Sequence, residues 1–216
     1  MTPDLDGALR VFGAATIYMA NSGRGAELQW QRQAALEEFT ETDLLRETAW
    51  VILCSGFRER IVRRVFDHIS LCFCDWESAS AILDADPRCR MAAMASFRNP
   101  AKLGAIVTAA LQVNEQGFPA FKQAVLAAPL TELQRLPYIG PVTVRHLAKN
   151  LGLNVAKPDR HLARVSLALG FDDADQFCTA VAKVIGERRN VIDLIVWRYL
   201  ADNPHAFRTV GVKNAY

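Results

Sequence analysis

The hydrophobic residues of this chain recur at intervals of three and four positions, which is the spacing of one buried face of an α-helix. Residues 58–70 show the pattern well. Their apolar stripe consists of Ile61, Val62, Val65, Phe66 and Ile69, and the residues off the stripe include Arg58, Arg60, Arg63 and Arg64. This segment is therefore expected to form an amphipathic helix with an arginine-rich outer face.

Signals for helix ends recur along the whole chain. Side-chain oxygens suited to cap a helix start occur in Thr40-x-x-Asp43, Asn99-Pro100 and Thr131-x-x-Gln134. Glycines that can end a helix occur at Gly56, Gly117, Gly152 and Gly170. No segment alternates apolar and polar residues as a strand would. The sequence predicts an all-α fold of roughly ten to twelve helices joined by short loops.

Composition adds limits to this prediction. Hydrophobic residues make up 51% of the 216 positions, so the chain has enough apolar material to fold. No apolar run approaches the ~20 residues of a membrane span, and we expect no membrane partner. The five cysteines are irregularly spaced, which favours free thiols in the cytoplasm over a disulfide framework. His68, Cys72 and Cys74 are a poor metal site, because a second ligand pair is missing.

The net charge is only +2, but it is unevenly distributed. Residues 135–164 contain six basic residues and one acidic residue, which gives this window a net charge of +5. Charge runs are usually solvated helix faces. In this window, however, two short helices are predicted to flank the turn 137–140, and a helix N-terminus next to cations is suited to bind phosphate.

The motif in this window resembles a known enzyme signature. The residues are Leu136-Pro137-x-Ile139-Gly140-x-x-Thr143, followed after a helix by Asp159-x-His161-Leu162-x-Arg164-Val165. They are similar to the signature of the helix-hairpin-helix DNA glycosylase superfamily, which includes endonuclease III, the mismatch adenine glycosylase and 8-oxoguanine glycosylase. The close match covers about thirty residues, and the segment 50–56 is similar to the family's first core helix in outline.

The resemblance implies a two-lobed, all-α protein with a DNA-binding cleft between the lobes. One lobe would be helical and barrel-like, would span residues 46–152 and would end with the hairpin. The other would be built from both termini, residues 1–45 and 153–216. The implied partner is double-stranded DNA that contains a lesion or a modified base, and the protein would act on it in the cytoplasm as a monomer.

The resemblance also implies a reaction. A glycosylase rotates its target base out of the duplex and cuts the bond between base and sugar, which leaves positive charge on the sugar. Asp159 matches the family's catalytic carboxylate, and nearby cations and a helix N-terminus are expected to keep it ionised. The alternative is a plain N-cap without catalysis. The DNA-binding residues would be Pro137, Tyr138, Ile139, Gly140, Thr143, Arg145, Lys149, Lys157, Arg160 and His161.

Position 142 decides between two reaction types. Relatives that also nick the strand carry a nucleophilic lysine two residues after the last glycine of the hairpin, and this chain has Val142 there. We therefore expect a monofunctional enzyme that leaves an abasic site. Two alternatives stay open: a bifunctional glycosylase and lyase that uses Lys149 or Lys157, and a non-catalytic helix-hairpin-helix DNA-binding protein.

The sequence departs from the family in the hairpin and at the C-terminus. Tyr138 replaces the first glycine of the hairpin, and tyrosine resists the left-handed backbone that glycine allows. A monovalent cation held by the carbonyls of Leu136 and Tyr138 is possible in this family. The four-cysteine run of some relatives is absent, so no iron–sulfur cluster or other cofactor is expected.

A glycosylase also needs a pocket for the flipped base and a wedge residue that fills the position which this base leaves in the stack. The sequence indicates these residues less strongly than it indicates the hairpin and Asp159. Phe57 and Arg58 occur where relatives place wedge residues, although Phe57 could equally be a core residue. Trp30 could stack on a flipped base. Asp193 interrupts an apolar run, and we interpret it as a capped or paired structural acid; the alternative is a second polar group that reaches the cleft.

Overall fold

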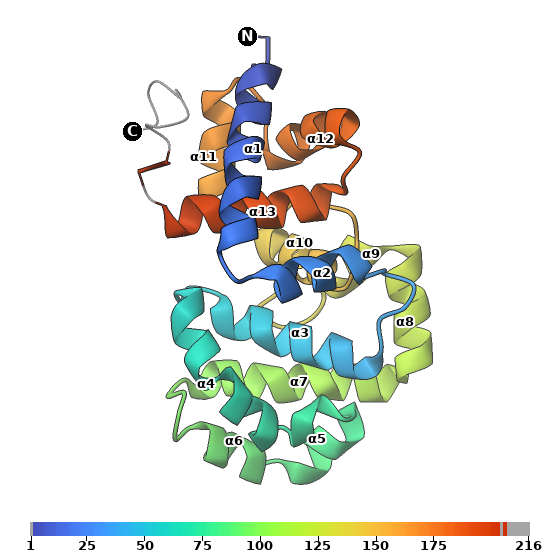
Figure 1. Cartoon of the computed structure of the whole chain (residues 1–216). Helices are drawn as coiled ribbons and strands as arrows, with labels where there is room; N and C mark the ends of the chain where they lie inside the picture. The colour runs from blue at the N-terminus through green and yellow to red at the C-terminus, as the bar shows by residue number, and fades with distance from the viewer. Residues whose placement is uncertain (1, 204, 207–216) are drawn as a thin grey trace. The chain divides into compact units, whose positions relative to one another are not determined.

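The computed structural model describes residues 2–203, 205 and 206, which form thirteen α-helices, one short 3-10 helix and no β-strand (Figure 1). The prediction of an all-α fold is confirmed. None of the helices in this part of the chain has both the length and the apolar character needed to cross a bilayer. None of the five cysteines, all of which lie in the described part of the chain, forms a disulfide.

The chain divides into two compact units. Unit 1 comprises the described residues of Met1–Ala34 and Gly152–Tyr216, and unit 2 comprises Ala35–Leu151. The first boundary lies before residue 35, whereas the sequence suggested residue 46. Unit 2 begins earlier because Leu36 and Phe39 are buried. The Phe39 carbonyl accepts a hydrogen bond from Lys122 Nζ (2.8 Å), and its ring contacts Phe118 at 5.9 Å.

Unit 1 is built around its last helix, α13. Its helices are α1 (Leu5–Asn21), α2 (Gly25–Gln33), α11 (Arg160–Ala168), α12 (Ala174–Ile185) and α13 (Arg189–Asp202). Helices α1, α2, α11 and α12 all pack against α13, and Figure 1 shows α1 crossing it. Because α13 is surrounded, it is apolar on most of its faces, and Val191, Ile192, Val196 and Leu200 are fully buried.

One arginine holds three backbone carbonyls where the two chain segments of unit 1 meet, beside ion pairs such as Arg32–Glu187 and Arg24–Asp202. Arg188, the residue before α13, donates from its guanidinium to the carbonyls of Arg32 (3.0 Å), Ala34 (2.8 Å) and Gly152 (2.7 Å). Its planar group with several donors suits this task. Arg188 thus ties the end of the first segment to the start of the second.

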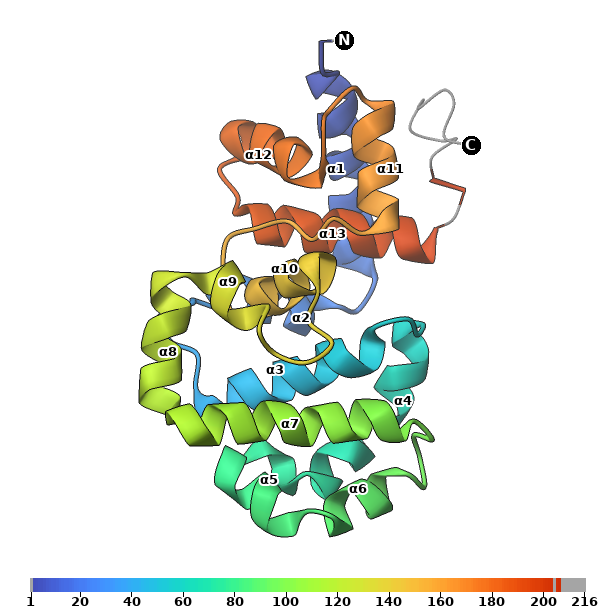
Figure 2. The same ribbon diagram turned by 180° about the vertical axis from the view of Figure 1, so that it is seen from behind.

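Unit 2 holds the remaining helices. They are α3 (Glu41–Cys54), α4 (Glu59–Cys72), the 3-10 helix η1 (Cys74–Trp76), α5 (Ala79–Ala85), α6 (Arg88–Ala93), α7 (Pro100–Gln116), α8 (Phe118–Ala127), α9 (Pro129–Leu133) and α10 (Pro141–Asn150). Helices α3 and α7 run side by side through the centre of the unit (Figure 2). Their facing residues, such as Ile52, Leu53 and Leu103, are fully buried.

The predicted helix ends can be compared one by one. Thr40 and Asp43 form the expected capping box, and the Asn99 side chain accepts from the Lys102 amide. The cap predicted at Thr131 is wrong, because α9 begins at Pro129 and Thr131 lies inside it. Proline at the first position of α9 is a stronger start signal than the threonine that follows it.

Candidate functional site

The predicted hairpin consists of α9, α10 and the turn between them in unit 2 (Figure 2). Gly140 is the N-cap of α10, and Pro141, which has no amide hydrogen, is its first residue. The Thr143 hydroxyl accepts a hydrogen bond from the Gly140 amide at 2.7 Å. The outward-pointing amides of the first turn therefore belong to Val142 and Thr143. Such amides favour an anionic ligand, as predicted for phosphate.

Thr143 therefore stabilises the turn, and its replacement tests this role. We expect Thr143→Ala to lower the free energy of unfolding by about 1 kcal/mol, because the Gly140 amide loses its acceptor. Thr143→Ser keeps the hydroxyl and serves as the matched control, with a stability close to that of the wild type. Circular dichroism during thermal denaturation measures both. Equal melting temperatures of the alanine and serine variants would rule out a structural role for this hydroxyl.

Tyr138 has a backbone conformation that a glycine would take more readily. Its φ is +61°, in the left-handed region, at a cost of about 1 kcal/mol for a residue with a Cβ. The Thr143 hydroxyl lies 3.3 Å from the Tyr138 carbonyl oxygen and 3.2 Å from that of Gly140. The hairpin thus keeps a tight turn, and the turn holds an aromatic side chain.

The two carbonyls proposed for a monovalent cation have partners in the protein. The Leu136 oxygen accepts from the Ile139 amide at 3.2 Å, and the Tyr138 oxygen lies near the Thr143 hydroxyl. Each carbonyl has a second lone pair, so these bonds leave room for a cation ligand. The cation stays a prediction.

Exposure separates the residues of unit 2 that were predicted to bind DNA. Tyr138 is 47% exposed, whereas Ile139 and Lys149 are each only 5% exposed. The half-buried residues are Pro137, Gly140, Thr143 and Arg145. A direct contact of DNA with the side chains of Ile139 and Lys149 does not fit this burial. Ile139 belongs to the apolar core beneath the turn, and the last turn of α10 is enclosed.

Asn150, the last residue of α10, is also buried. Its Nδ2 donates to Glu47 Oε2 of α3 at 2.8 Å. Burial raises the pKa of Glu47, while Arg46 and Asn150 lower it. The inward face of α10 consists of Val144, Leu147, Ala148 and Leu151, which recur at helical spacing and are all buried. Asn150 thus connects α10 with α3 and is unavailable to a ligand.

A buried lysine joins the hairpin to the loop after α3. Lys102 Nζ donates to the carbonyls of Ile52, Leu53 (3.1 Å) and Ser55, which lie at the C-terminal end of α3. It also lies 5.0 Å from the ring centroid of Phe57 and 5.6 Å from that of Tyr138. Burial lowers the pKa of Lys102.

Sequence reasoning did not identify Lys102 as a functional residue. One feature of the sequence points to the burial of Lys102: it lies beside Leu103 and close to Ile106, two apolar positions of α7 that are both buried. A lysine in the first turn of a helix is ordinarily solvated, so this signal is weak.

The candidates for the wedge and the candidate for the base pocket belong to different units. Phe57 is 42% exposed, and its ring lies 5.2 Å from that of Phe97, so one face packs and the rest is accessible. Arg58 is exposed beside it. Both belong to unit 2, whereas Trp30, which is 40% exposed, belongs to α2 of unit 1.

Asp159 is the N-cap of α11 in unit 1, as the sequence predicted. Its Oδ1 accepts hydrogen bonds from the amides of His161 (2.8 Å) and Leu162 (2.9 Å). Its Oδ2 is buried and has no hydrogen-bond partner among the described residues. An N-cap uses one carboxylate oxygen, so the capping role accounts for Oδ1 and leaves the buried Oδ2 unexplained.

The surroundings of Asp159 shift its pKa upward, opposite to the direction expected from the nearby cations. Burial raises the pKa of Asp159, and the charge of Asp193 raises it further. The Leu162 amide, Lys157 and His161 lower the pKa by less. The prediction counted the cations near Asp159 in the sequence, but Asp193 comes from α13, and burial could not be read from the sequence.

The segment before Asp159 is held by hydrogen bonds to α12 and α13. The Ala156 amide donates to Asp175 Oδ1 (3.0 Å), and the Lys157 amide donates to Asp193 Oδ2 (3.2 Å). Asp193 is 1% exposed, and its bond to Lys157 fits the structural interpretation of this acid. Its effect on the pKa of Asp159 adds a second, electrostatic role.

The other predicted residues of unit 1 surround the start of α11. Lys157 is half-buried, and its Nζ lies 5.9 Å from the ring centroid of Trp197. Arg160 is exposed and donates from Nε to His161 Nε2 at 3.3 Å. Burial lowers the pKa of His161, which favours its neutral form. Arg160 is thus the most accessible of these cations.

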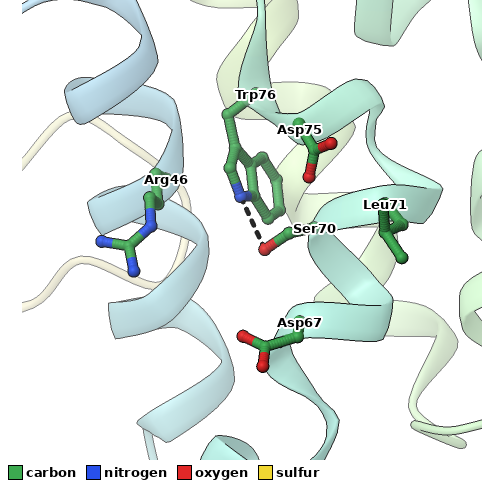
Figure 3. A pocket seen from close by; sticks show the side chains of 6 residues that line it. All are labelled: Arg46, Asp67, Ser70, Leu71, Asp75 and Trp76. Atoms are coloured by element: carbon green, nitrogen blue, oxygen red, sulfur yellow. Dashed lines mark hydrogen bonds between the residues drawn. The ribbon is translucent and has the colours of Figure 1, made fainter.

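A pocket in unit 2 contains none of the predicted site residues (Figure 3). It is lined by Arg46, Asp67, Ser70, Leu71, Asp75 and Trp76. The Trp76 indole nitrogen donates to Ser70 Oγ at 2.9 Å across one side of it. Its lining contains two carboxylates and one guanidinium, so it is a poor site for a phosphate group. The described residues also contain no cluster of three or more metal-ligating side chains.

In comparisons with known proteins, no family model, no curated protein and no solved structure matches this chain.

Proposed function

We propose that the protein is a monofunctional DNA glycosylase, which hydrolyses the bond between a damaged, mispaired or modified base and its sugar. The observation that carries this proposal is the environment of Asp159. This carboxylate is fixed at a helix start by two amide bonds, and it keeps one buried oxygen without a hydrogen bond. A fixed, partly desolvated carboxylate is suited to stabilise the positive charge of a sugar as the base departs.

The hairpin supports DNA as the partner. It presents the first-turn amides of α10 and the half-buried Arg145, and both can contact a phosphate. Eight residues separate the end of α10 at Asn150 from Asp159. In this proposal the hairpin binds the DNA backbone, and Asp159 acts at the sugar of the flipped nucleotide.

The side chain at position 142 supports hydrolysis without strand cleavage. Val142 is 48% exposed at the start of α10, where a lysine would provide an amine nucleophile. Water then replaces the base, and the ionised Asp159 can orient that water. The product is an abasic site in an intact strand.

A panel of duplexes that carry alkylated, oxidised, deaminated or mismatched bases tests the proposal. We expect at least one duplex to yield an alkali-labile site and no strand break before alkali treatment. A covalent adduct after borohydride treatment would instead show a lyase that uses Lys157 or Lys149. The non-catalytic alternative predicts no labile site in any duplex and an affinity that falls steeply with salt. The non-catalytic alternative is supported by the N-cap position of Asp159, because the capping of α11 explains an aspartate there without catalysis.

The pKa of Asp159 leads to a prediction about pH. Only the ionised carboxylate stabilises the charged sugar, so the excision rate should rise with pH through the raised pKa of Asp159. Asp193→Asn removes the neighbouring charge and keeps an oxygen that can accept from the Lys157 amide. The acidic limb of the pH–rate profile should then move to lower pH. An unchanged limb would show that Asp193 does not influence the reacting carboxylate.

A further inference from the structure

Tyr138 combines two unfavourable properties in one residue. Its backbone is in the left-handed region at φ +61°, which a glycine would occupy without strain. The residue is 47% exposed, so it contributes little to the core. Strain at an exposed aromatic residue is a reason to look for a ligand, because the fold alone would favour glycine here.

The Tyr138 ring has a fixed neighbour. Lys102 Nζ lies within 6 Å of the ring centroids of both Tyr138 and Phe57, at 5.6 and 5.0 Å. The ammonium is held by three carbonyls at the end of α3, and Phe57 packs on Phe97 at 5.2 Å. Two half-exposed rings thus share one immobile cation, and each is ordered by a cation–π contact.

The charges near these rings favour a polyanion. Arg58 follows Phe57 directly, and Arg98 follows Phe97, and both arginines are exposed. The nearest acid in this segment, Glu59, accepts a hydrogen bond from Arg63. Aromatic rings beside cations are the combination that binds exposed nucleobases, because the rings stack on the bases while the cations contact the phosphates.

We propose that Tyr138 and Phe57 form an aromatic platform that stacks on nucleobases with an exposed face, such as the bases beside a vacated position in duplex DNA. This inference rests on the proposed function, because excision creates such a position. A fully stacked duplex offers no free base face, so the platform distinguishes opened DNA from intact DNA. Intact duplex is bound through phosphate contacts alone.

Fluorescence anisotropy with three labelled DNAs tests the platform: an intact duplex, the same duplex with a tetrahydrofuran abasic analogue, and a single strand. The wild type should bind the abasic duplex more tightly than the intact one. Tyr138→Gly should weaken binding to the abasic duplex and the single strand about tenfold and leave the intact duplex unchanged. Tyr138→Phe should bind like the wild type, because stacking does not need the hydroxyl.

Two controls separate stacking from a loss of fold. The melting temperature of Tyr138→Gly should equal or exceed that of the wild type, because glycine relieves the strained φ. If this variant melts lower, Phe57→Ala, which leaves the hairpin intact, should show the same selective loss. Met91→Ala removes another exposed apolar side chain of unit 2, 72% exposed, and should leave all three affinities unchanged.

Three outcomes would overturn the platform. They are unchanged binding of both Tyr138→Gly and Phe57→Ala, an equal loss on all three DNAs, and equal wild-type affinity for intact and abasic duplexes. A failure of the proposed function gives a different result. No lesion is then excised, but the Tyr138 and Phe57 variants still lose affinity for the abasic duplex and the single strand only. If the protein excises a lesion but the Tyr138 and Phe57 variants show no selective loss of binding to opened DNA, the platform is refuted and the proposed function stands.

Discussion

Replacing Asp159 with asparagine should lower the rate of base excision by about a thousandfold and leave DNA affinity within about a factor of two. Asparagine can still accept the amide bonds of His161 and Leu162 and cap α11. It lacks the negative charge that stabilises the sugar. Single-turnover excision and anisotropy measure the two quantities. Asp173→Asn, at the N-cap of α12, is the matched control and should keep full activity.

The same variant should be more stable than the wild type at neutral pH. Because the pKa of Asp159 is raised in the folded protein, the unfolded carboxyl loses its proton at lower pH than the folded one. As pH rises between these two pKa values, the folded state binds more protons and the wild type loses stability. The loss is complete above the folded pKa and absent below the unfolded one.

Asp159→Asn removes this penalty, so its stability advantage should disappear in acid. Urea denaturation at several pH values measures the difference. If the free energy of unfolding of the variant exceeds that of the wild type by the same amount at every pH, the difference comes from packing and not from the charge of Asp159. Full excision activity of the variant would remove Asp159 from the mechanism.

Lys102→Met should have the largest effect on stability, a loss of about 3 kcal/mol, because it leaves the three α3 carbonyls without their donor. The melting temperature should fall by roughly 6–12 °C. Lys122→Met is the matched control, since Lys122 donates to the single carbonyl of Phe39, and it should cost about 1 kcal/mol. Equal losses in both variants would contradict the role assigned to Lys102. Thermal denaturation followed by circular dichroism compares them.

The helices and the buried face of α10 could be predicted because they depend on local spacing. Val144, Leu147 and Leu151 recur at helical intervals, and all three are buried. The position of Asp159 as an N-cap follows from the same local logic. Helix 58–70 shows the limit of the method: Val62 and Phe66 are buried, but Ile61, on the same expected stripe, is 45% exposed.

Features that depend on distant parts of the chain were missed. The three carbonyls that hold Lys102 lie 47 to 50 residues away from it in sequence. Asp193, which raises the pKa of Asp159, comes from another helix. Lys149 was predicted to bind DNA, but the last turn of α10 is enclosed and buries it. Spacing along one helix reports its apolar stripe and says little about how wide the buried face becomes.

The most direct test of the central claim is to detect the released base by mass spectrometry, with wild-type protein and Asp159→Asn incubated with the same lesion duplexes. We predict that the wild type releases a free base from at least one duplex and leaves the strand intact until alkali is added. The variant should bind that duplex and release no detectable base in the same time. Release at the wild-type rate by Asp159→Asn, or tight binding by the wild type without release from any duplex, would contradict the account.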